Sequence, residues 1–418
     1  MTLLPPSKMT LQNDIKKVKK AALVLATVSS DTKKKALQNI IHALHTNRLA
    51  LLTANKKDLA QAKRNNLSQP LIQRLTLSDQ KFQELLKGLA SLMAAKDPVG
   101  KILSEVELDH DLILQQITCP IGVIGVIFEA RPDAFVQIVS LCLTSGNAVI
   151  VKGGTEAAHS NKALFQLFTQ ATKNILPQDW LYLVETREDV NKLLSLDEDI
   201  DMIIPRGSDA FVKYIQDHTK IPVLGHSEGI CHLYVDEEAN QDMAIKIILD
   251  SKCQYPAACN AVETILLHKK LQKTFLPLLK KVLQKHGVMV KEGAKGKEYN
   301  DLMVSLNLVN SIQEAITHIN TYGSGHTDGI ITDNKQKAEQ FCQGVDSASV
   351  LWNCSTRFAD GYRYGKGAEV GISTNKIHAR GPVGVEGLLI YKYILSGKGH
   401  LVRDYAEGKK QFIHKVLR

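Results

Sequence analysis

Cys259 is the residue of this chain whose surroundings best suit covalent chemistry. The segment Gln254–His268 reads QYPAACNAVETILLH, and Ala261–His268 is a β-branched, apolar run that predicts a buried strand. An accessible thiol with small neighbours at the start of a strand is well placed to attack a carbonyl carbon. The alternative is an unreactive core cysteine, because free cysteine is among the most commonly buried residue types.

Two turns have the composition of an anion-binding site. Ile203–Ser208 reads IIPRGS, in which Gly207 permits close approach and Ser208 can cap a helix, so a pyrophosphate could rest on the free backbone N–H groups. Val151–Glu156 reads VKGGTE, in which Lys152 could reach a ribose or its phosphate, or could be a solvated surface amine. No GxGxxG motif is present, so the sequence does not support a standard Rossmann fingerprint.

Several histidines and cysteines lie close enough in sequence to raise the question of a metal. They are His226, Cys231, His232, Cys253 and Cys259. None of them is spaced as a CxxC zinc pair, and the adjacent Cys231 and His232 would point to opposite faces of a predicted strand. We therefore predict no metal cofactor.

The elements that must position these residues alternate along the middle of the chain. Residues 11–95 show helical periodicity, and Leu103–Thr118 reads as a hairpin with its turn at Asp109–Asp111. After Pro120, short apolar strands alternate with helices at Asp133–Leu143, Glu156–Lys173 and Ser208–Gln216. The expected strands are Ile121–Phe128, Ala148–Lys152, Leu181–Val184, Met202–Ile204 and Ile221–Leu224. Continuous apolar strands indicate a parallel sheet that is covered on both faces, with ligands outside the carboxyl ends of its strands.

A second α/β region follows. We expect a helix at Gln241–Lys252, the strand at Ala261–His268, another helix at Lys270–His286 and a strand near Val304–Val309. Leu388–Leu395 predicts a late strand, and the basic tail is expected to end as a helix. The predicted fold class is α/β, with a doubly wound parallel-sheet domain, a second α/β domain and a few additional strands.

The bulk composition is that of an ordinary soluble protein. Seven cysteines at irregular spacing argue against a disulfide framework and for the cytoplasm, and we find neither a signal peptide nor an apolar run that would cross a membrane. The 52 basic and 43 acidic residues give a net charge of +9, but the basic residues are scattered along helices and are not interleaved with aromatic residues. We therefore expect small anionic ligands rather than nucleic acid as partners.

The order of these elements resembles the aldehyde dehydrogenase superfamily, and more narrowly the γ-glutamyl phosphate reductase family. The resemblance extends over nearly the whole chain. Its blocks are CPIGVIGVIFEARPDAF (Cys119–Phe135), SGNAVIVKGGTEAAHSN (Ser145–Asn161), IPRGSDAFV (Ile204–Val212), IPVLGHSEGICHLYVD (Ile221–Asp236), PAACNAVETILLH (Pro256–His268), VNSIQEAITHINTYGSGHTDGI (Val309–Ile330) and RFADGYRYGKGAEVGISTNKIHARGPVG (Arg357–Gly384).

The resemblance implies a reaction and the residues that carry it. The family reduces L-glutamyl 5-phosphate to L-glutamate 5-semialdehyde with NADPH, so Cys259 would form a thioester, with backbone N–H groups of Cys259 or Asn260 at the oxyanion. The asparagine that commonly stabilises the oxyanion is replaced by Ala130, and we expect the adjacent Arg131 to bind the substrate's anionic groups. Weaker arginine candidates are Arg206, Arg357, Arg363 and Arg380.

The same resemblance assigns the cofactor contacts. Lys152 matches a lysine on the adenosine ribose, Gly207 and Ser208 match the turn at the pyrophosphate, and Glu298 aligns with a glutamate on the nicotinamide ribose. Thr155 stands where many NAD-using relatives carry an acid, which agrees with NADPH, although the neighbouring Glu156 leaves the preference open.

One departure bears on the direction of the reaction. Hydrolytic aldehyde dehydrogenases carry an ELGG glutamate that activates water, whereas the chain reads Leu224-Gly225-His226-Ser227-Glu228 there, with no glutamate at that position. A reductase must not hydrolyse its thioester, so this loss favours reduction. The alternative is an oxidative NAD(P)-dependent aldehyde dehydrogenase.

We expect three functional regions. Residues 1–105 and 120–230 would bind NADP(H), and residues 231–386 would carry the cysteine. Residues 106–119 and 387–418 would form oligomerisation strands and a tail. We expect a homo-oligomer, functional coupling to glutamate 5-kinase, and no membrane partner.

Overall fold

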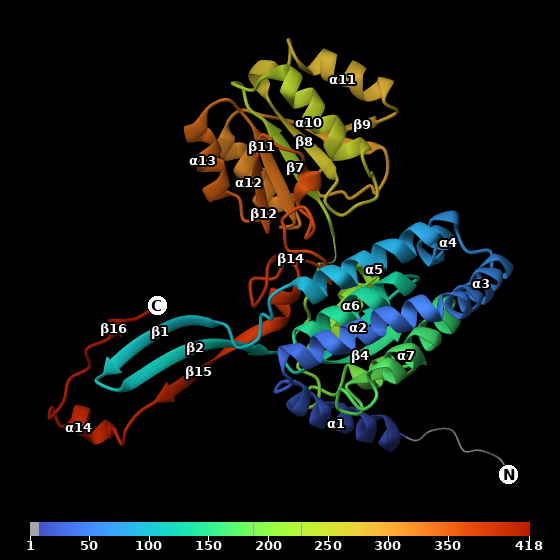
Figure 1. Cartoon of the computed structure of the whole chain (residues 1–418). Helices are drawn as coiled ribbons and strands as arrows, with labels where there is room; N and C mark the ends of the chain where they lie inside the picture. The colour runs from blue at the N-terminus through green and yellow to red at the C-terminus, as the bar shows by residue number, and fades with distance from the viewer. Residues whose placement is uncertain (1–7, 187, 227) are drawn as a thin grey trace.

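The computed structural model describes residues 8–186, 188–226 and 228–418 (Figure 1). Its α-helices are α1 (Lys8–Leu25), α2 (Ser30–Thr46), α3 (Arg48–Arg64), α4 (Gln69–Leu75), α5 (Asp79–Ala94), α6 (Pro132–Thr144), α7 (Ala158–Thr172), α8 (Glu188–Leu193), α9 (Asp209–Asp217), α10 (Gln241–Cys253), α11 (Leu276–Lys285), α12 (Ile312–Tyr322), α13 (Lys335–Gly344) and α14 (Val402–Ala406). Short 3₁₀ turns are η1 (Thr155–Ala157), η2 (Lys269–Leu271), η3 (Thr356–Phe358) and η4 (Val385–Leu388). Among the described helices, none has the length and apolar character that spanning a bilayer requires.

The described residues form sixteen strands. They are β1 (Ile102–Asp109), β2 (Leu112–Pro120), β3 (Val123–Phe128), β4 (Ala148–Gly153), β5 (Leu181–Leu183), β6 (Met202–Arg206), β7 (Cys231–Val235), β8 (Val262–His268), β9 (Met289–Glu292), β10 (Met303–Val309), β11 (Thr327–Ile331), β12 (Ser349–Trp352), β13 (Gly371–Ser373), β14 (Gly381–Val383), β15 (Leu389–Ser396) and β16 (Lys415–Val416).

The first sheet is parallel and has the strand order β5-β4-β3-β6. Every residue of β3 and β4 is buried, as a sheet covered on both faces requires. Helices α2, α5, α6 and α7 pack on one face, and α1 packs on the other with α8 and α9 (Figure 1). The predicted doubly wound arrangement is therefore present.

The second sheet is also parallel, with the order β12-β11-β7-β8-β10-β9. Helices α10 and α11 cover one face, and α12 and α13 cover the other. Between the two α/β bodies runs the small antiparallel pair β13–β14, and the label of β14 lies at their junction in Figure 1.

An antiparallel arm projects from the first body (Figure 1). The β1–β2 hairpin turns at His110–Asp111, and Asp111 has a positive φ of 61°, so the predicted hairpin and its turn are confirmed. Strand β15 pairs with β2, and the short β16 pairs with β1. The expected terminal helix is wrong, because the chain ends on a strand and α14 lies earlier.

The expected strand at Ile221–Leu224 is also wrong. This segment makes only an isolated parallel bridge between Ile203 and Val223, with backbone bonds of 2.8 Å from Ile203 N to Pro222 O and from Leu224 N to Ile203 O. Pro222 has no N–H to donate, so it cannot extend a regular ladder and is tolerated only at the edge of the sheet.

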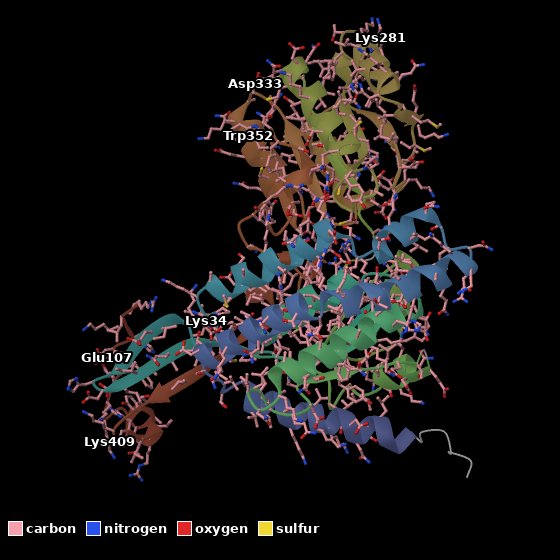
Figure 2. The ribbon with its side chains drawn as sticks, turned by 45° about the vertical axis from the view of Figure 1, so that its right-hand side comes forward. Lys34, Glu107, Lys281, Asp333, Trp352 and Lys409 are labelled. Carbon is pink, nitrogen blue, oxygen red and sulfur yellow. The ribbon has the colours of Figure 1, made fainter. Side chains whose placement is uncertain are left out.

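Charged side chains project from all parts of the molecule. In Figure 2 the labelled lysines lie on separate parts: Lys34 on α2, Lys281 on α11, and Lys409 beyond α14. These three lysines thus lie on three different parts of the molecule.

Candidate active site

Cys259 lies in the short loop between α10 and β8, directly before the buried strand that follows it. Its backbone is fixed from two sides. The Cys231 thiol donates to the Cys259 carbonyl at a distance of 3.2 Å, and the backbone of Gly229 packs so closely that a Cβ there would lie 2.2 Å from the same oxygen. Glycine is therefore required at position 229, and the loop is held where β7 begins.

The amino ends of three neighbouring strands bring two imidazoles to this thiol. His226 precedes β7 and His326 precedes β11, and one ligand atom each from His226, Cys259 and His326 lies within 4.8 Å of the other two. The two imidazole rings are edge-on, with centroids 4.7 Å apart. Because β11, β7 and β8 are adjacent and parallel, residues that are distant in sequence meet at one edge.

Four charged side chains act on the Cys259 sulfur. Burial raises the pKa of the thiol to about 11, and the Arg206 guanidinium opposes this shift more than any other charge. The carboxylates of Glu369 and Glu298 raise the thiol pKa further, whereas Arg357 lowers it. The free thiol is therefore protonated near neutral pH, and the arginines stabilise the thiolate when it forms.

Arg206 links the first sheet to this site. It ends β6, and its Nη1 donates to the carbonyl of Val370 at 2.5 Å, just before β13. Gly371 has a φ of 153°, and a Cβ there would lie 2.4 Å from Arg206 Nη1, so a larger residue would displace the guanidinium. Burial lowers the pKa of Arg206, and the nearby positive charge of Arg131 lowers it further.

Arg131 lies near enough to Arg206 for its positive charge to lower the pKa of that guanidinium. It lies at the start of α6, its side chain is 44% exposed, and its Nη2 is 3.3 Å from Asp133 Oδ2. Because Arg131 is exposed and Arg206 is half-buried near the sulfur, the pair can hold two anionic groups at different depths.

The predicted cofactor residues Lys152, Gly207 and Ser208 meet at the carboxyl edge of the first sheet. Strand β3 pairs Ile127 with Lys152 on one side and Phe128 with Arg206 on the other. Lys152 is buried, and its Nζ donates to the Gly153 carbonyl at 2.5 Å.

Gly207 and Ser208 are exposed and directly precede α9. Ser208 is the N-cap residue, but among the described residues its side chain makes no capping hydrogen bond, so the predicted side-chain cap is absent. A Cβ on Gly207 would lie 2.8 Å from Phe211 and 2.9 Å from the Glu129 carboxylate carbon. The glycine therefore leaves the backbone of this turn open to a close ligand.

Glu298 and Asn260 are held by the backbone of the second body. Glu298 Oε1 accepts from Gly229 N at 3.0 Å, which places this carboxylate next to the glycine that backs Cys259. The Asn260 side chain donates to the Ala359 carbonyl at 2.8 Å and is thus used in packing. Within the described chain neither Cys259 nor Asn260 donates its backbone N–H to another residue, so both amides can serve an oxyanion.

The structure also adds residues that sequence reasoning missed or ranked low. His326 and Glu369 had no role, and Arg206 was only a weaker candidate. The IPRGS motif carried a signal for Arg206, since the residue that ends a strand beside a phosphate turn faces the ligand edge. His326 and Glu369 are 67 and 110 positions from Cys259, and only the fold brings them to the sulfur.

Comparison with known proteins identifies this combination of sheets and cysteine loop. The model described as "Aldehyde dehydrogenase family" matches residues 8–295, and the chain belongs to that family. Gamma-glutamyl phosphate reductase of Acetivibrio thermocellus is 51% identical over 416 residues, with 96% of each chain covered. The reductase of Methanosarcina acetivorans is 51% identical over 435 residues, with 97% of each chain covered.

A solved structure supports the narrower assignment. The crystal structure of gamma-glutamyl phosphate reductase from Thermotoga maritima is 36% identical, has a TM-score of 0.91, and covers 93% of this chain and 99% of its own. Within the aldehyde dehydrogenases the chain therefore belongs with the gamma-glutamyl phosphate reductases. The predicted α/β fold class and the family resemblance are both confirmed.

Proposed function

We propose that the chain reduces L-glutamyl 5-phosphate with NADPH to L-glutamate 5-semialdehyde and phosphate, in L-proline biosynthesis from glutamate. The observation that carries the proposal is the position of Cys259. It lies on a glycine-backed loop and faces Arg206 of the first sheet, in a chain about half identical to gamma-glutamyl phosphate reductases. A nucleophile beside a fixed guanidinium suits an acyl phosphate, whose leaving group is an anion.

The first chemical step is acyl transfer to Cys259. The thiolate attacks the acyl carbon, the carbon–oxygen bond to phosphate breaks, and inorganic phosphate leaves with the bonding pair. Arg206 stabilises both the thiolate and the departing phosphate, and we assign the substrate carboxylate to the more exposed Arg131.

The oxyanion that forms during acyl transfer needs donors other than a side-chain amide. Ala130 occupies the position of the usual asparagine, and Asn260 uses its own amide on Ala359. We therefore assign the backbone N–H groups of Asn260 and Cys259 to the oxyanion, where one donor typically contributes about 2.7–4 kcal/mol of transition-state stabilisation.

The residues at the edge of the first sheet fit a nicotinamide dinucleotide. A buried amine at Lys152 and an open turn at Gly207–Ser208 supply the charge and backbone donors that a ribose and pyrophosphate require. The carboxylate of Glu298 suits a ribose hydroxyl. When bound, NADPH supplies the hydride that converts the thioester to the aldehyde.

The preference for NADPH rests on the residues after Lys152. Thr155 is exposed, and the neighbouring Glu156 uses Oε1 to accept the Ala130 N–H at 2.5 Å. A carboxylate held by the backbone in this way leaves room for a 2′-phosphate near Thr155. NADPH should therefore be used in preference to NADH.

A coupled assay with glutamate 5-kinase, ATP and NADPH tests the reaction directly. We expect NADPH oxidation only when the kinase supplies the acyl phosphate. In reverse, the semialdehyde should reduce NADP⁺ only when phosphate is present. Equal reduction without phosphate would instead support the oxidative, hydrolytic aldehyde dehydrogenase.

We also propose that the chain works as a homo-oligomer beside glutamate 5-kinase. Outside its first residue, strand β15 is exposed and carries large apolar side chains such as Tyr393 and Leu395. It is an edge strand with unpaired backbone groups on its outer side. The first body then binds the cofactor, the second carries the nucleophile, and the arm joins subunits.

A further inference from the structure

Three atoms of the kind that bind transition metals converge at the nucleophile. One nitrogen from His226, one from His326 and the sulfur of Cys259 all lie within 4.8 Å of one another. The sequence separations are 33 and 67 residues, so none of the usual zinc spacings could have indicated the cluster. The three residues come from loops that precede β7, β8 and β11, and the rigid sheet fixes them relative to one another.

Hydrogen bonds orient both imidazoles. His226 Nδ1 is 2.7 Å from the Ile372 carbonyl oxygen, which can only accept, so Nδ1 carries the proton and the lone pair lies on Nε2. His326 Nδ1 is 2.9 Å from Thr327 Oγ1. Metal-binding histidines commonly engage their second ring nitrogen with a backbone or side-chain oxygen in this way.

His326 has a buried ring nitrogen that is available to a ligand. The side chain is 0% exposed, yet Nε2 has no hydrogen-bond partner in the described part of the chain. A buried polar nitrogen without a partner is costly. His232 and His318 also have a buried Nε2 of this kind, and His326 differs from them because it lies beside Cys259 and His226. A cation at this position would satisfy that nitrogen.

We propose that His226, Cys259 and His326 form a reversible Zn²⁺ site. A thiolate with two imidazoles is a donor set that Zn²⁺ prefers. A triangle with sides of 4.8 Å has its centre about 2.8 Å from each corner. Zinc bonds of about 2.0–2.3 Å therefore require each donor to move by less than about 1 Å, and a water completes the tetrahedron.

The surrounding charges permit a cation here. Glu298 and Glu369 act on the sulfur with negative charge, and Arg206 and Arg357 act on it with positive charge. The two carboxylates balance the two guanidinium groups. The thiolate then offsets one of the two positive charges of the metal.

Zinc at this site blocks acyl transfer. As the Zn–S bond forms, the thiol proton is released to solvent, and no electron is transferred. The sulfur lone pair that would attack the acyl phosphate is then shared with the metal. The site is thus inhibitory and is not a cofactor site for the reaction. The inhibition rests on the proposed function of Cys259, whereas metal binding does not.

Cobalt absorption tests the site without any need for activity. Metal-free full-length protein is titrated with Co²⁺, whose thiolate charge-transfer and tetrahedral d–d bands report a Cys–His environment, and Zn²⁺ is then added in competition. We expect one equivalent of Co²⁺ to give both bands and Zn²⁺ to abolish them. Cys259→Ser should lose the charge-transfer band, and His226→Gln and His326→Gln should each weaken binding at least about tenfold.

The controls are Cys253→Ser, which removes a thiol of the same segment, and His286→Gln, which removes an exposed histidine of the same body. Both should bind Co²⁺ as the unmodified protein does. Circular dichroism shows whether the His326→Gln protein folds. If it does not fold, the Co²⁺ titration of His226→Gln tests the site, because His226 is partly exposed and its replacement disturbs the core less. The proposed Zn²⁺ site would be wrong if Co²⁺ gave no thiolate band, or if His226→Gln bound Co²⁺ as tightly as the unmodified protein does. Either result would hold even if the reductase assay succeeds.

A parallel measurement concerns inhibition alone. Zn²⁺ should inhibit the unmodified enzyme, a chelator should restore its activity, and pre-bound acyl phosphate should protect it. Spectroscopic binding without inhibition would separate the metal site from the catalytic role of Cys259. That result would contradict the role of Cys259 as the nucleophile, but it would agree with the proposed Zn²⁺ site.

Discussion

The chemistry at the residue scale depends on how the charges around one sulfur atom balance. Burial raises the pKa of Cys259 to about 11, and Glu369 and Glu298 act in the same direction. Arg206 and Arg357 oppose them, with Arg206 contributing most. A thiol with a raised pKa is largely protonated near neutral pH and is therefore less readily oxidised, because the thiolate is the reactive form.

Replacement of Cys259 by serine tests the nucleophile. A serine hydroxyl remains protonated under these conditions and cannot form the thioester, so we expect reductase activity to fall at least about 10³-fold. NADPH affinity, measured by fluorescence titration, should change by less than about twofold, because Cys259 is not among the residues assigned to the cofactor. Cys253→Ser, on α10, is the control and should remain active. An inactive Cys253 variant beside an active Cys259→Ser protein would reverse the assignment.

Replacement of Arg206 by lysine tests the guanidinium. Lysine keeps the charge but loses the fork that donates to Val370 and faces the substrate, so kcat/KM should fall about 10–100-fold. That range corresponds to about 1.4–2.7 kcal/mol of transition-state stabilisation. Iodoacetamide alkylation should slow in Arg206→Met, where the charge that favours the thiolate is gone. The exposed Arg64→Lys on α3 serves as the control, and an equal loss of kcat/KM there would contradict a specific role for Arg206.

At the scale of elements, the active-site loop is positioned by close backbone packing against the start of β7. Gly229→Ala would place a Cβ 2.2 Å from the Cys259 carbonyl oxygen, so the loop must move. We expect at least a tenfold loss of kcat and a fall of about 1–3 kcal/mol in the free energy of unfolding, measured by urea titration. Gly88→Ala, a helical position with nothing within 4 Å of the new Cβ, should be neutral or stabilising. Full activity in Gly229→Ala would show that the loop adapts.

A partly buried ion cluster holds the carboxyl end of β7 against α13. Lys337 Nζ lies 3.1 Å from Asp236, 3.0 Å from Glu237 and 2.8 Å from Glu238. These contacts raise the pKa of Lys337 above its usual value, and those of Lys270 and Lys337 lower the pKa of Glu237 to about 2. The cluster therefore stabilises the second body only while its carboxylates are ionised.

The lowered pKa of Glu237 predicts how the stability of the protein depends on pH. A depressed carboxylate pKa gives stability that is present above the unfolded value of about 4.5 and is lost as the pH falls toward about 2. Lys337→Met should lower the melting temperature at pH 7, with a loss of about 1–3 kcal/mol, and have a smaller effect at pH 3. Lys335→Met, an exposed neighbour, is the control. An effect that is equal at both pH values would exclude the ion cluster as its cause.

Local signals predicted the elements that have strong local patterns. The buried strand after Cys259 and the turn at Gly207–Ser208 could be predicted because apolar runs and glycine turns determine local backbone conformation. The segment at Ile221–Leu224 was misread because its apolar pattern concealed the missing N–H of Pro222. Strand β9 was missed because it is only four residues long and largely exposed, so it has no clear apolar pattern.

The site as a whole could be predicted only in part. Residues that the resemblance covers, such as Lys152 and Glu298, could be assigned roles, and those roles stay predictions. His326 carries no local sign of proximity to Cys259, since it depends on β11 lying beside β7 in the sheet. Parallel sheets place residues together through strand order, which short-range patterns do not encode.

At the scale of the whole molecule, the two sheets present opposite edges to the site. The first contributes the carboxyl ends of β4 and β6, as ligand sites of doubly wound sheets do, and the second contributes the amino ends of β7, β8 and β11. The expectation that ligands lie outside the carboxyl ends of the parallel strands therefore applies only to the first sheet. The strands β13 and β14 connect the edges through the Arg206–Val370 bond.

Substitutions on the antiparallel arm test whether the protein is an oligomer whose subunits are joined through β15. Tyr391 and Tyr393 on β15 are 55% and 61% exposed, and their strand is an edge that a second copy could extend. In the double variant Tyr391→Glu/Tyr393→Glu, paired strands would bring like charges together and lose apolar burial. We therefore expect an oligomer for the unmodified chain and a monomer for the variant, measured by light scattering after gel filtration. Leu49→Glu, which is 78% exposed on α3, is the matched control and should leave the oligomer intact. A monomeric unmodified chain, or an oligomer that survives both tyrosine substitutions, would mean that β15 does not join subunits.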